Sequence, residues 1–283
     1  MLRSLGYELV KLRVQKKNYV MLAGHILFLA LCYLAFRSTR GGIFNRFDKT
    51  MNFHIDDLNS YLDGFFFARI AMVPTFIVLM PIVVATLAGD CVAGEMQEGN
   101  LKLYVSRPRS RNRILMSKFF AVYVATLLYC LYFAVVNLLI GISIFGISHT
   151  QLIMLVDDVF GTDVVIMGIP NALIRYFAAT IYFSFSLTAL GAITLFFSTI
   201  FNRMSAATVS VISLYFVCYV IGALPFSDTV RPYLLSEVMN NSFLLWLSPL
   251  PLNKLLANLS TLSLYLVGFL LMATLTFNYK DLK

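Results

Sequence analysis

The sequence contains little charge for its length. Of its 283 residues, 13% are Asp, Glu, Lys or Arg and 59% are hydrophobic, and the mean hydropathy is +0.81. Soluble domains typically have about 25% charged and about 45 to 50% apolar residues. The composition therefore excludes a soluble domain and predicts a polytopic membrane protein. The net charge of +8 is not taken to indicate a nucleic-acid partner, because basic residues beside hydrophobic spans follow from the positive-inside rule.

Residues that bind metals or form disulfides are scarce and scattered. The cysteines and histidines are Cys32, Cys91, Cys130, Cys218, His25, His54 and His149. No spacing among them indicates a disulfide framework or a zinc site. The sequence also has no Gly-Lys pair, which a phosphate-binding P-loop requires, and no HExxH or GxSxG motif. We therefore predict no catalytic residue, no metal site and no cofactor bound by this chain itself.

Long apolar segments divide the chain into six expected membrane spans, each close to or above the roughly 20 residues needed to cross a bilayer. The spans are predicted at 19–36, 64–89, 114–145, 173–201, 206–224 and 255–277. The expected fold is an all-α integral membrane protein that forms a single transmembrane domain over residues 1–283. Pro74 and Pro81 interrupt the second span, and we expect neighbouring helices to satisfy the carbonyl groups that these prolines leave free.

The first 18 residues are predicted to form an amphipathic helix in the membrane interface. Their apolar helical face consists of Leu2, Leu5, Leu9 and Leu12. A signal peptide is the alternative interpretation, but no small-residue cleavage site follows the apolar stretch, which favours a retained first span.

The distribution of charge predicts the orientation of the chain. If both termini lie inside, the inner segments hold 14 of the 22 basic residues, whereas the outer segments hold nine of the 14 acidic residues. The positive-inside rule then places both termini and the loop at 90–113 in the cytoplasm, in a multi-pass protein of the plasma membrane. Residues 37–63, 146–172 and 225–254 are expected outside, and 225–254 are expected to form short interfacial or re-entrant helices before the last span.

The densest run of charge, residues 90–118, joins the second and third spans. Glu95 and Glu98 precede Gly99, a residue that commonly ends a helix. The Arg107-Pro108 pair then ends regular structure, because the residue before proline avoids the helical region. The predicted result is a short, stiff element between two spans, so that a force on the loop would reach both of them.

Small polar side chains recur every four residues in the fourth span, at Thr180, Ser184 and Thr188. Such a stripe lets another helix approach closely. The alternative is that it lines a polar pathway.

The run GEMQEGNLKLYVSRPRSRNRILMSK, residues 94–118, resembles the segment after the second span in permease subunits of type-2, export-type ABC transporters. An acidic residue, a Gly-Thr-Leu sequence, Ser-x-Pro, an Arg and a Lys that opens the next helix recur in that family. The matching residues here are Glu95, Gly99, Leu101, Ser106, Pro108, Arg111 and Lys118, with Asn100 in place of the usual Thr.

The resemblance implies a homodimer or heterodimer of permeases served by separate cytoplasmic ABC ATPase subunits, which would bind ATP and magnesium. Residues 95–103 would be the coupling helix that docks on the ATPase, and Glu98 and Arg107 are expected to take part in that contact. The N-terminal amphipathic helix would be a second contact, and the segment 225–254 would form the outer gate.

The leading hypothesis is therefore the membrane subunit of an ATP-driven exporter. Few ionisable residues lie near the middle of the spans, which favours an amphiphilic cargo such as a peptide, a lipid or a hydrophobic drug. Two alternatives remain, an ATP-independent channel and a membrane-embedded enzyme that uses Asp157, Asp158 or Asp163.

Overall fold

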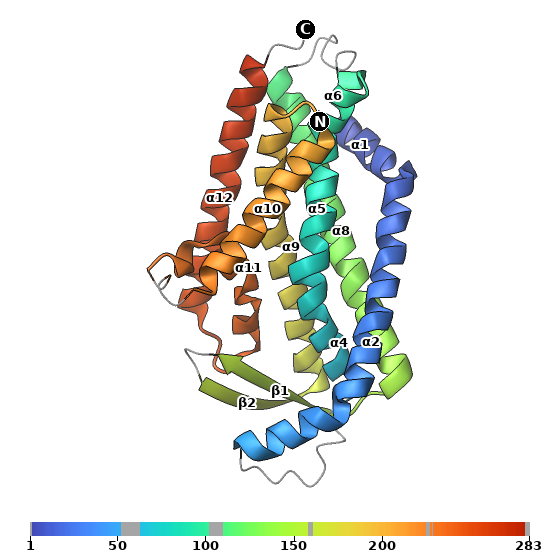
Figure 1. Ribbon diagram of the computed structural model, residues 1–283, viewed down its shortest axis with the longest axis vertical. Helices are drawn as coiled ribbons and strands as arrows, with labels where there is room; N and C mark the ends of the chain where they lie inside the picture. The colour runs from blue at the N-terminus through green and yellow to red at the C-terminus, as the bar shows by residue number, and fades with distance from the viewer. Residues whose placement is uncertain are drawn as a thin grey trace.

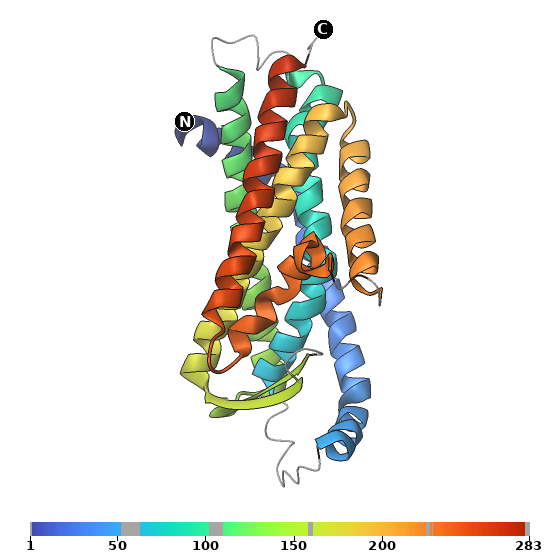
Figure 2. The same ribbon diagram turned by 90° about the vertical axis from the view of Figure 1, so that its left-hand side faces the viewer.

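The computed structural model describes residues 2–51, 63–101, 110–157, 161–224, 227 and 229–280. These residues form an elongated bundle of long helices with a two-stranded sheet at one end (Figures 1 and 2). Both chain termini lie toward the opposite end, which is also where α6 is found. The six helices that are long and apolar enough to cross a membrane cover Lys16–Ser38, Gly64–Gln97, Arg111–Phe145, Ile169–Ile200, Met204–Gly222 and Leu252–Tyr279. The expected helical fold with six long apolar helices, each a candidate membrane span, is therefore confirmed.

Helix α9 (Ile169–Ile200) is the central element. It contacts α5 (Met80–Gly89), α8 (Arg111–Phe145), α10 (Met204–Gly222) and α12 (Leu252–Tyr279). Most of its side chains are buried, including Phe183, whose ring stacks on that of Phe76 with centroids 4.8 Å apart. A helix that is apolar on all sides is expected at the core of a bundle.

The second span is one continuous helix made of several segments. These are α4 (Gly64–Pro74), the π-helical η1 (Thr75–Leu79), α5, the π-helical η2 (Asp90–Gly94) and α6 (Glu95–Gln97). Pro81 has no N–H to offer the carbonyl oxygen of Ile77, four residues earlier. The hydroxyl of Tyr215 on α10 donates to that oxygen over 3.0 Å. This bond confirms the expectation that a neighbouring helix satisfies a carbonyl freed by proline.

Two helices extend further than the sequence predicted. The second span continues to Gln97, although residues from Asp90 onward were expected in a loop. Its charged residues can stay in the helix because they are paired within the bundle, as described below. Helix α2 (Lys16–Met51) likewise continues beyond residue 36, into a segment that was expected to be an external loop.

The connection between the third and fourth spans contains an antiparallel hairpin that was not predicted. Strands β1 (Thr150–Asp157) and β2 (Gly161–Gly168) pair from Thr150 opposite Gly168 to Asp157 opposite Gly161. Seven of the 16 residues in the two strands are Thr, Val or Ile, whose β-branched side chains favour extended structure. The fold is therefore helical with one small sheet rather than entirely α.

Asp63 ties the base of this hairpin to the start of α4. One carboxylate oxygen, Oδ1, accepts a hydrogen bond from the backbone N–H of Phe66 over 3.0 Å and so caps the helix. The other, Oδ2, accepts from the N–H of Ser148 (2.8 Å) and from Nε2 of Gln151 (2.7 Å). A single side chain thus fixes the relative position of helix and hairpin.

The segment before the last span folds into three short helices. They are η3 (Arg231–Tyr233), α11 (Leu235–Asn240) and η4 (Asn241–Trp246). The guanidinium Nη1 of Arg175 on α9 donates to the carbonyl oxygens of Leu245 (3.1 Å) and Leu247 (2.7 Å). These helices are too short to cross a membrane, and α11 and η4 pack against α9 and α12 within the bundle.

Candidate functional site

Four charged side chains from three separate elements meet at the end of the bundle that carries the termini. We call them the charge cluster: Glu8 and Lys11 of α1 (Leu2–Val14), Glu95 of α6 and Lys118 of α8. Lys118 is fully buried, and Glu8 and Glu95 are 4% and 5% exposed. Ionised groups are removed from water at such positions only when they are paired.

The geometry of the charge cluster supplies this pairing. Nζ of Lys118 lies 2.5 Å from Oε1 of Glu95 and 3.1 Å from Oε1 of Glu8. Nζ of Lys11 lies 2.7 Å from the same Glu95 oxygen. The formal charges of these two ammonium groups and two carboxylates cancel. The pairs fix α1 to the end of the second span and to the start of the third.

A second group of contacts holds the elbow between α1 and α2. Oδ2 of Asp90, on η2, lies 2.6 Å from Nζ of Lys17 and accepts a hydrogen bond from Nε2 of Gln15 over 3.0 Å. Asp90 is 8% exposed. The N-terminal part of the chain is therefore attached to the second span at two places, one turn apart.

The π-helical turn η2 is held to the central helix by Ser198. The hydroxyl of Ser198 accepts a hydrogen bond from the N–H of Ala93 (2.8 Å) and donates one to the carbonyl oxygen of Gly89 (2.9 Å). Single π-helical turns inside α-helices occur frequently at functional sites. Here the turn lies between Asp90 and Glu95, the two acidic residues that receive the N-terminal contacts.

Lys11, like Glu8, lies on α1 and therefore outside the membrane-spanning helices. Burial alone would lower the pKa of its ammonium group, but the hydrogen bond and the negative charge of Glu95 outweigh burial, so the pKa is raised above its ordinary value. Lys11 is therefore protonated at neutral pH. Because the pKa of Lys11 is raised in the folded state, the pairing of its ammonium group with Glu95 contributes fully to stability below the ordinary lysine pKa. This contribution is lost only as the pH rises through the raised value.

The residues expected at a coupling site differ in how far they are exposed. Glu98 is exposed, and its carboxylate accepts a hydrogen bond from Nδ2 of Asn100 over 3.0 Å. Gly99 has φ of +77°, which confirms the predicted end of the helix. Leu101 is fully buried. Arg107 and Pro108 lie outside the described residues.

Arg111 caps another helix of the same chain. Its Nη1 donates to the carbonyl oxygens of Phe277 (3.1 Å), Asn278 (3.0 Å) and Lys280 (2.8 Å) at the end of α12. Cations at this position satisfy carbonyl groups that the last helical turn leaves free. Among the described contacts, Arg111 therefore connects the start of α8 to the end of the last span.

The stripe on the fourth span is internal. Thr180, Ser184 and Thr188 are at most 2% exposed. The hydroxyl of Thr180 donates to the carbonyl oxygen of Tyr176 (2.9 Å), and that of Thr188 to the carbonyl oxygen of Ser184 (2.7 Å). Bonding to the helix's own backbone lets Thr180 and Thr188 lie inside the bundle, whereas Oγ of Ser184 has no hydrogen-bond partner among the described residues.

Sequence reasoning did not identify Glu8, Lys11, Asp90, Lys17 or Ser198 as site residues. A signal was present for Glu8, which is the only acidic residue before Asp48 and lies in a strongly basic segment. Ser198 gave no comparable signal, because serine is common in transmembrane helices.

Comparison with known families identifies the chain. A family model described as ABC-2 family transporter protein matches residues 4–218, a range that includes every member of the charge cluster. A comparison with curated proteins finds no match. The family match confirms the resemblance inferred from residues 94–118 and covers most of the chain. The chain therefore belongs to the ABC-2 family of transporter membrane proteins.

Proposed function

We propose that this membrane subunit is the permease of an ATP-driven exporter in the plasma membrane. It would form the translocation pathway with a second permease copy or a paralogue, and separate ABC ATPase subunits would bind ATP and magnesium. Both termini would be cytoplasmic, and the cargo would be amphiphilic, such as a peptide, a lipid or a hydrophobic drug. Family membership supports transport as the general function, so the membrane-enzyme alternative is not retained.

The observation that carries the proposal is the charge cluster. It joins α1, α6 and α8 through ion pairs of 2.5 to 3.1 Å. Helix α6 is continuous with α5, so a displacement of α6 moves the second span directly. Because Lys118 belongs to α8, the same displacement reaches the third span. Rigid movement of packed helices is one of the established forms of conformational switching.

The segment just beyond α6 would receive the force. Glu98 is exposed and therefore available to a partner. Leu101 is buried in one cluster with Leu115 of α8 and Phe277 of α12. An exposed acidic residue beside a buried apolar anchor suits a docking element, because the partner contacts the first while the second transmits the displacement.

The internal position of Thr180, Ser184 and Thr188 bears on the proposed dimer. Since these residues face the interior of the same chain, a second permease would contact helices other than this face of α9. The stripe then serves packing within the chain, and a pathway between two copies would be lined by other residues.

The test begins with purification of the tagged chain from its native membrane in a mild detergent. We expect a soluble subunit with a nucleotide-binding loop to accompany the chain and to confer ATPase activity. Transport is then measured for Glu98→Lys, which reverses an exposed charge at the docking segment. We expect at least about a fivefold loss of ATP-coupled transport, in the usual range of coupling energies.

The control is Asn171→Lys, which adds a positive charge at an exposed residue in the first turn of α9, directly after β2, and should transport normally. Normal transport by Glu98→Lys with an intact ATPase would contradict the docking assignment. Transport that continues without any ATPase would favour the channel alternative.

A further inference from the structure

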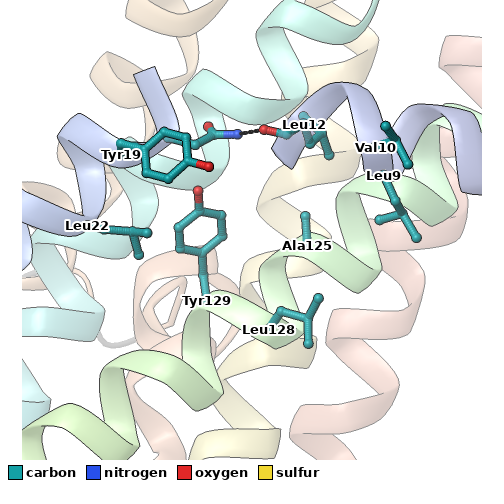
Figure 3. Close-up of a pocket in the computed structure, with 9 residues that line it drawn as sticks. Leu9, Val10, Leu12, Tyr19, Leu22, Ala125, Leu128 and Tyr129 are labelled. Atoms are coloured by element: carbon teal, nitrogen blue, oxygen red, sulfur yellow. Dashed lines mark hydrogen bonds between the residues drawn. The ribbon is translucent and has the colours of Figure 1, made fainter. Parts of the chain in front are cut away.

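An apolar cavity of about 510 Å³ lies at the elbow where α1 meets α2, against α8 (Figure 3). Its apolar wall includes Leu9 and Leu12 of α1, Leu22 of α2, and Ala125 and Leu128 of α8. This volume falls within the range of about 300 to 1,000 Å³ that is typical of ligand pockets. The cavity is separate from the charge cluster, although both involve α1.

The cavity opens toward the outer surface of the bundle. Leu128 is 58% exposed, and Val10 and Tyr19, which also line the cavity, are about equally exposed. Two of the three helices that form it are membrane spans, and α1 lies across them at the elbow. Its mouth therefore faces lipid rather than water, and an apolar lining of this kind does not hold ordered water.

One end of the cavity is polar. Asn18 is 6% exposed, and its Nδ2 donates to the carbonyl oxygen of Leu12. Its Oδ1 also lies out of solvent but has no hydrogen-bond partner within the described part of the chain. Buried acceptors are normally satisfied, so an occupant with a hydrogen-bond donor would complete this site. The rings of Tyr19 and Tyr129 lie beside one another at this level, with the Tyr129 hydroxyl directed toward Tyr19.

The charge around the elbow favours an anion. Residues 9–18 include four basic residues and no acidic residue, and two of the four, Lys11 and Lys17, pair with Glu95 and Asp90. Lys16 is exposed, and the described residues include no ion-pair partner for it. Basic residues near a membrane surface attract anionic lipid headgroups.

We propose that this cavity binds one acyl chain of an anionic phospholipid whose headgroup carries a hydroxyl, of the phosphatidylglycerol type. The chain lies against Leu12, Leu22 and Ala125, a headgroup hydroxyl donates to Oδ1 of Asn18, and the phosphate lies near Lys16. The lipid is a resident ligand of the elbow and not the transported cargo. It fills the gap between α1 and the two spans and so supports the position from which α1 reaches Glu95.

Native mass spectrometry of the purified full-length chain tests this assignment without ATP or a transport assay. Phosphatidylglycerol and phosphatidylcholine with identical acyl chains are titrated separately, and the bound fraction is measured. Phosphatidylcholine has neither the net charge nor the hydroxyl donor. We expect phosphatidylglycerol to bind at least about fivefold more tightly, and Lys16→Gln to reduce this preference about fivefold, as the loss of one basic contact predicts.

Two variants fill the cavity. Ala125→Phe occupies its interior and Leu128→Trp its mouth, and each should weaken phosphatidylglycerol binding at least about tenfold. Because Leu128 is 58% exposed, its replacement leaves the core intact and decides the question if Ala125→Phe fails to fold. The control is Leu139→Trp, an exposed position of α8 that does not line the cavity, and it should bind lipid normally.

Equal binding of the two lipids would overturn the headgroup assignment. Undiminished phosphatidylglycerol binding by Leu128→Trp would overturn the location. If Leu128→Trp abolished binding of a second copy of the chain and left lipid binding unchanged, the cavity would be a contact between copies and the proposal would be wrong.

Discussion

Lys118 lies seven residues into a long apolar helix and is fully buried, yet it has two carboxylates within hydrogen-bond distance. The cost of removing its charge from water is offset by Glu8 and Glu95, and Lys11 balances the remaining negative charge. A buried pair of this kind is strongly destabilised when one partner is removed, because the other charge remains in place without compensation. At the residue scale, Lys118 is therefore the position on which the attachment of α1 depends most.

Replacing Lys118 with Met tests this dependence. The change leaves Glu8 and Glu95 facing each other without their shared cation, and we expect the free energy of unfolding to fall by about 3 to 5 kcal/mol. The loss is measured by thermal unfolding in detergent, with size-exclusion chromatography as the readout of the folded fraction. Arg113→Met, which removes a cation at an exposed position of the same helix, should change stability little. Adding Glu95→Gln to Lys118→Met should recover part of the loss, and equal stability of Lys118→Met and the wild type would refute the ion-pair assignment.

At the scale of elements, the contact between α4 and α8 depends on two glycines. Gly64 and Gly141 lie so close that a Cβ atom added to either residue would overlap with the backbone carbonyl group of the other. Backbone atoms cannot turn aside as a flexible side chain can. The second and third spans therefore approach each other closely at the end distant from the charge cluster, where the N–H of Gly64 also donates to the carbonyl oxygen of Gly146 over 2.9 Å.

The variant Gly141→Ala should force these two helices apart. We expect a loss of stability of about 1 to 3 kcal/mol, the usual cost of overpacking a closely packed interior. The matched control is Gly268→Ala in α12, where an added Cβ would meet no atom within 4 Å. The control should be neutral or slightly stabilising, since alanine favours the helix over glycine. Both are measured by thermal unfolding in the same detergent, and a Gly141→Ala melting temperature equal to that of the control would show that the helices separate without cost.

At the scale of the whole molecule, the two ends of the bundle differ in character. One end holds α6, the start of α8 and both termini, and the other holds the hairpin of β1 and β2 (Figure 1). The described basic residues of α1 and of the start of α8 lie toward the first end, and the positive-inside rule favours that end in the cytoplasm.

Single cysteines test this orientation in intact cells. Thr150→Cys lies at the hairpin end and Ser205→Cys at the start of α10, and both positions are exposed. In a variant whose four native cysteines are replaced by alanine, a membrane-impermeant maleimide should label Thr150→Cys directly. It should label Ser205→Cys only after the membrane is permeabilised. The reverse pattern would invert the proposed topology.

Much of the fold was determined by local properties of the sequence. The six spans follow from runs of apolar residues, because crossing hydrocarbon imposes a length and a composition on each helix separately. The helix end just before Gly99 also follows from a local preference, because glycine readily adopts the positive φ that ends a helix. The hairpin at 150–168 was missed, although its Thr, Val and Ile content was a local signal for strands.

Only the tertiary structure decided where the charged residues lie. By composition alone, residues 90–97 belonged to a solvated loop, whereas the fold continues the helix through them and buries Asp90 and Glu95. Whether a charge can be buried depends on its partners, and these are distant in sequence: Glu8 and Lys118 are 110 residues apart. Local patterns determined which segments cross the membrane, and long-range pairing determined how α1 is joined to the second and third spans.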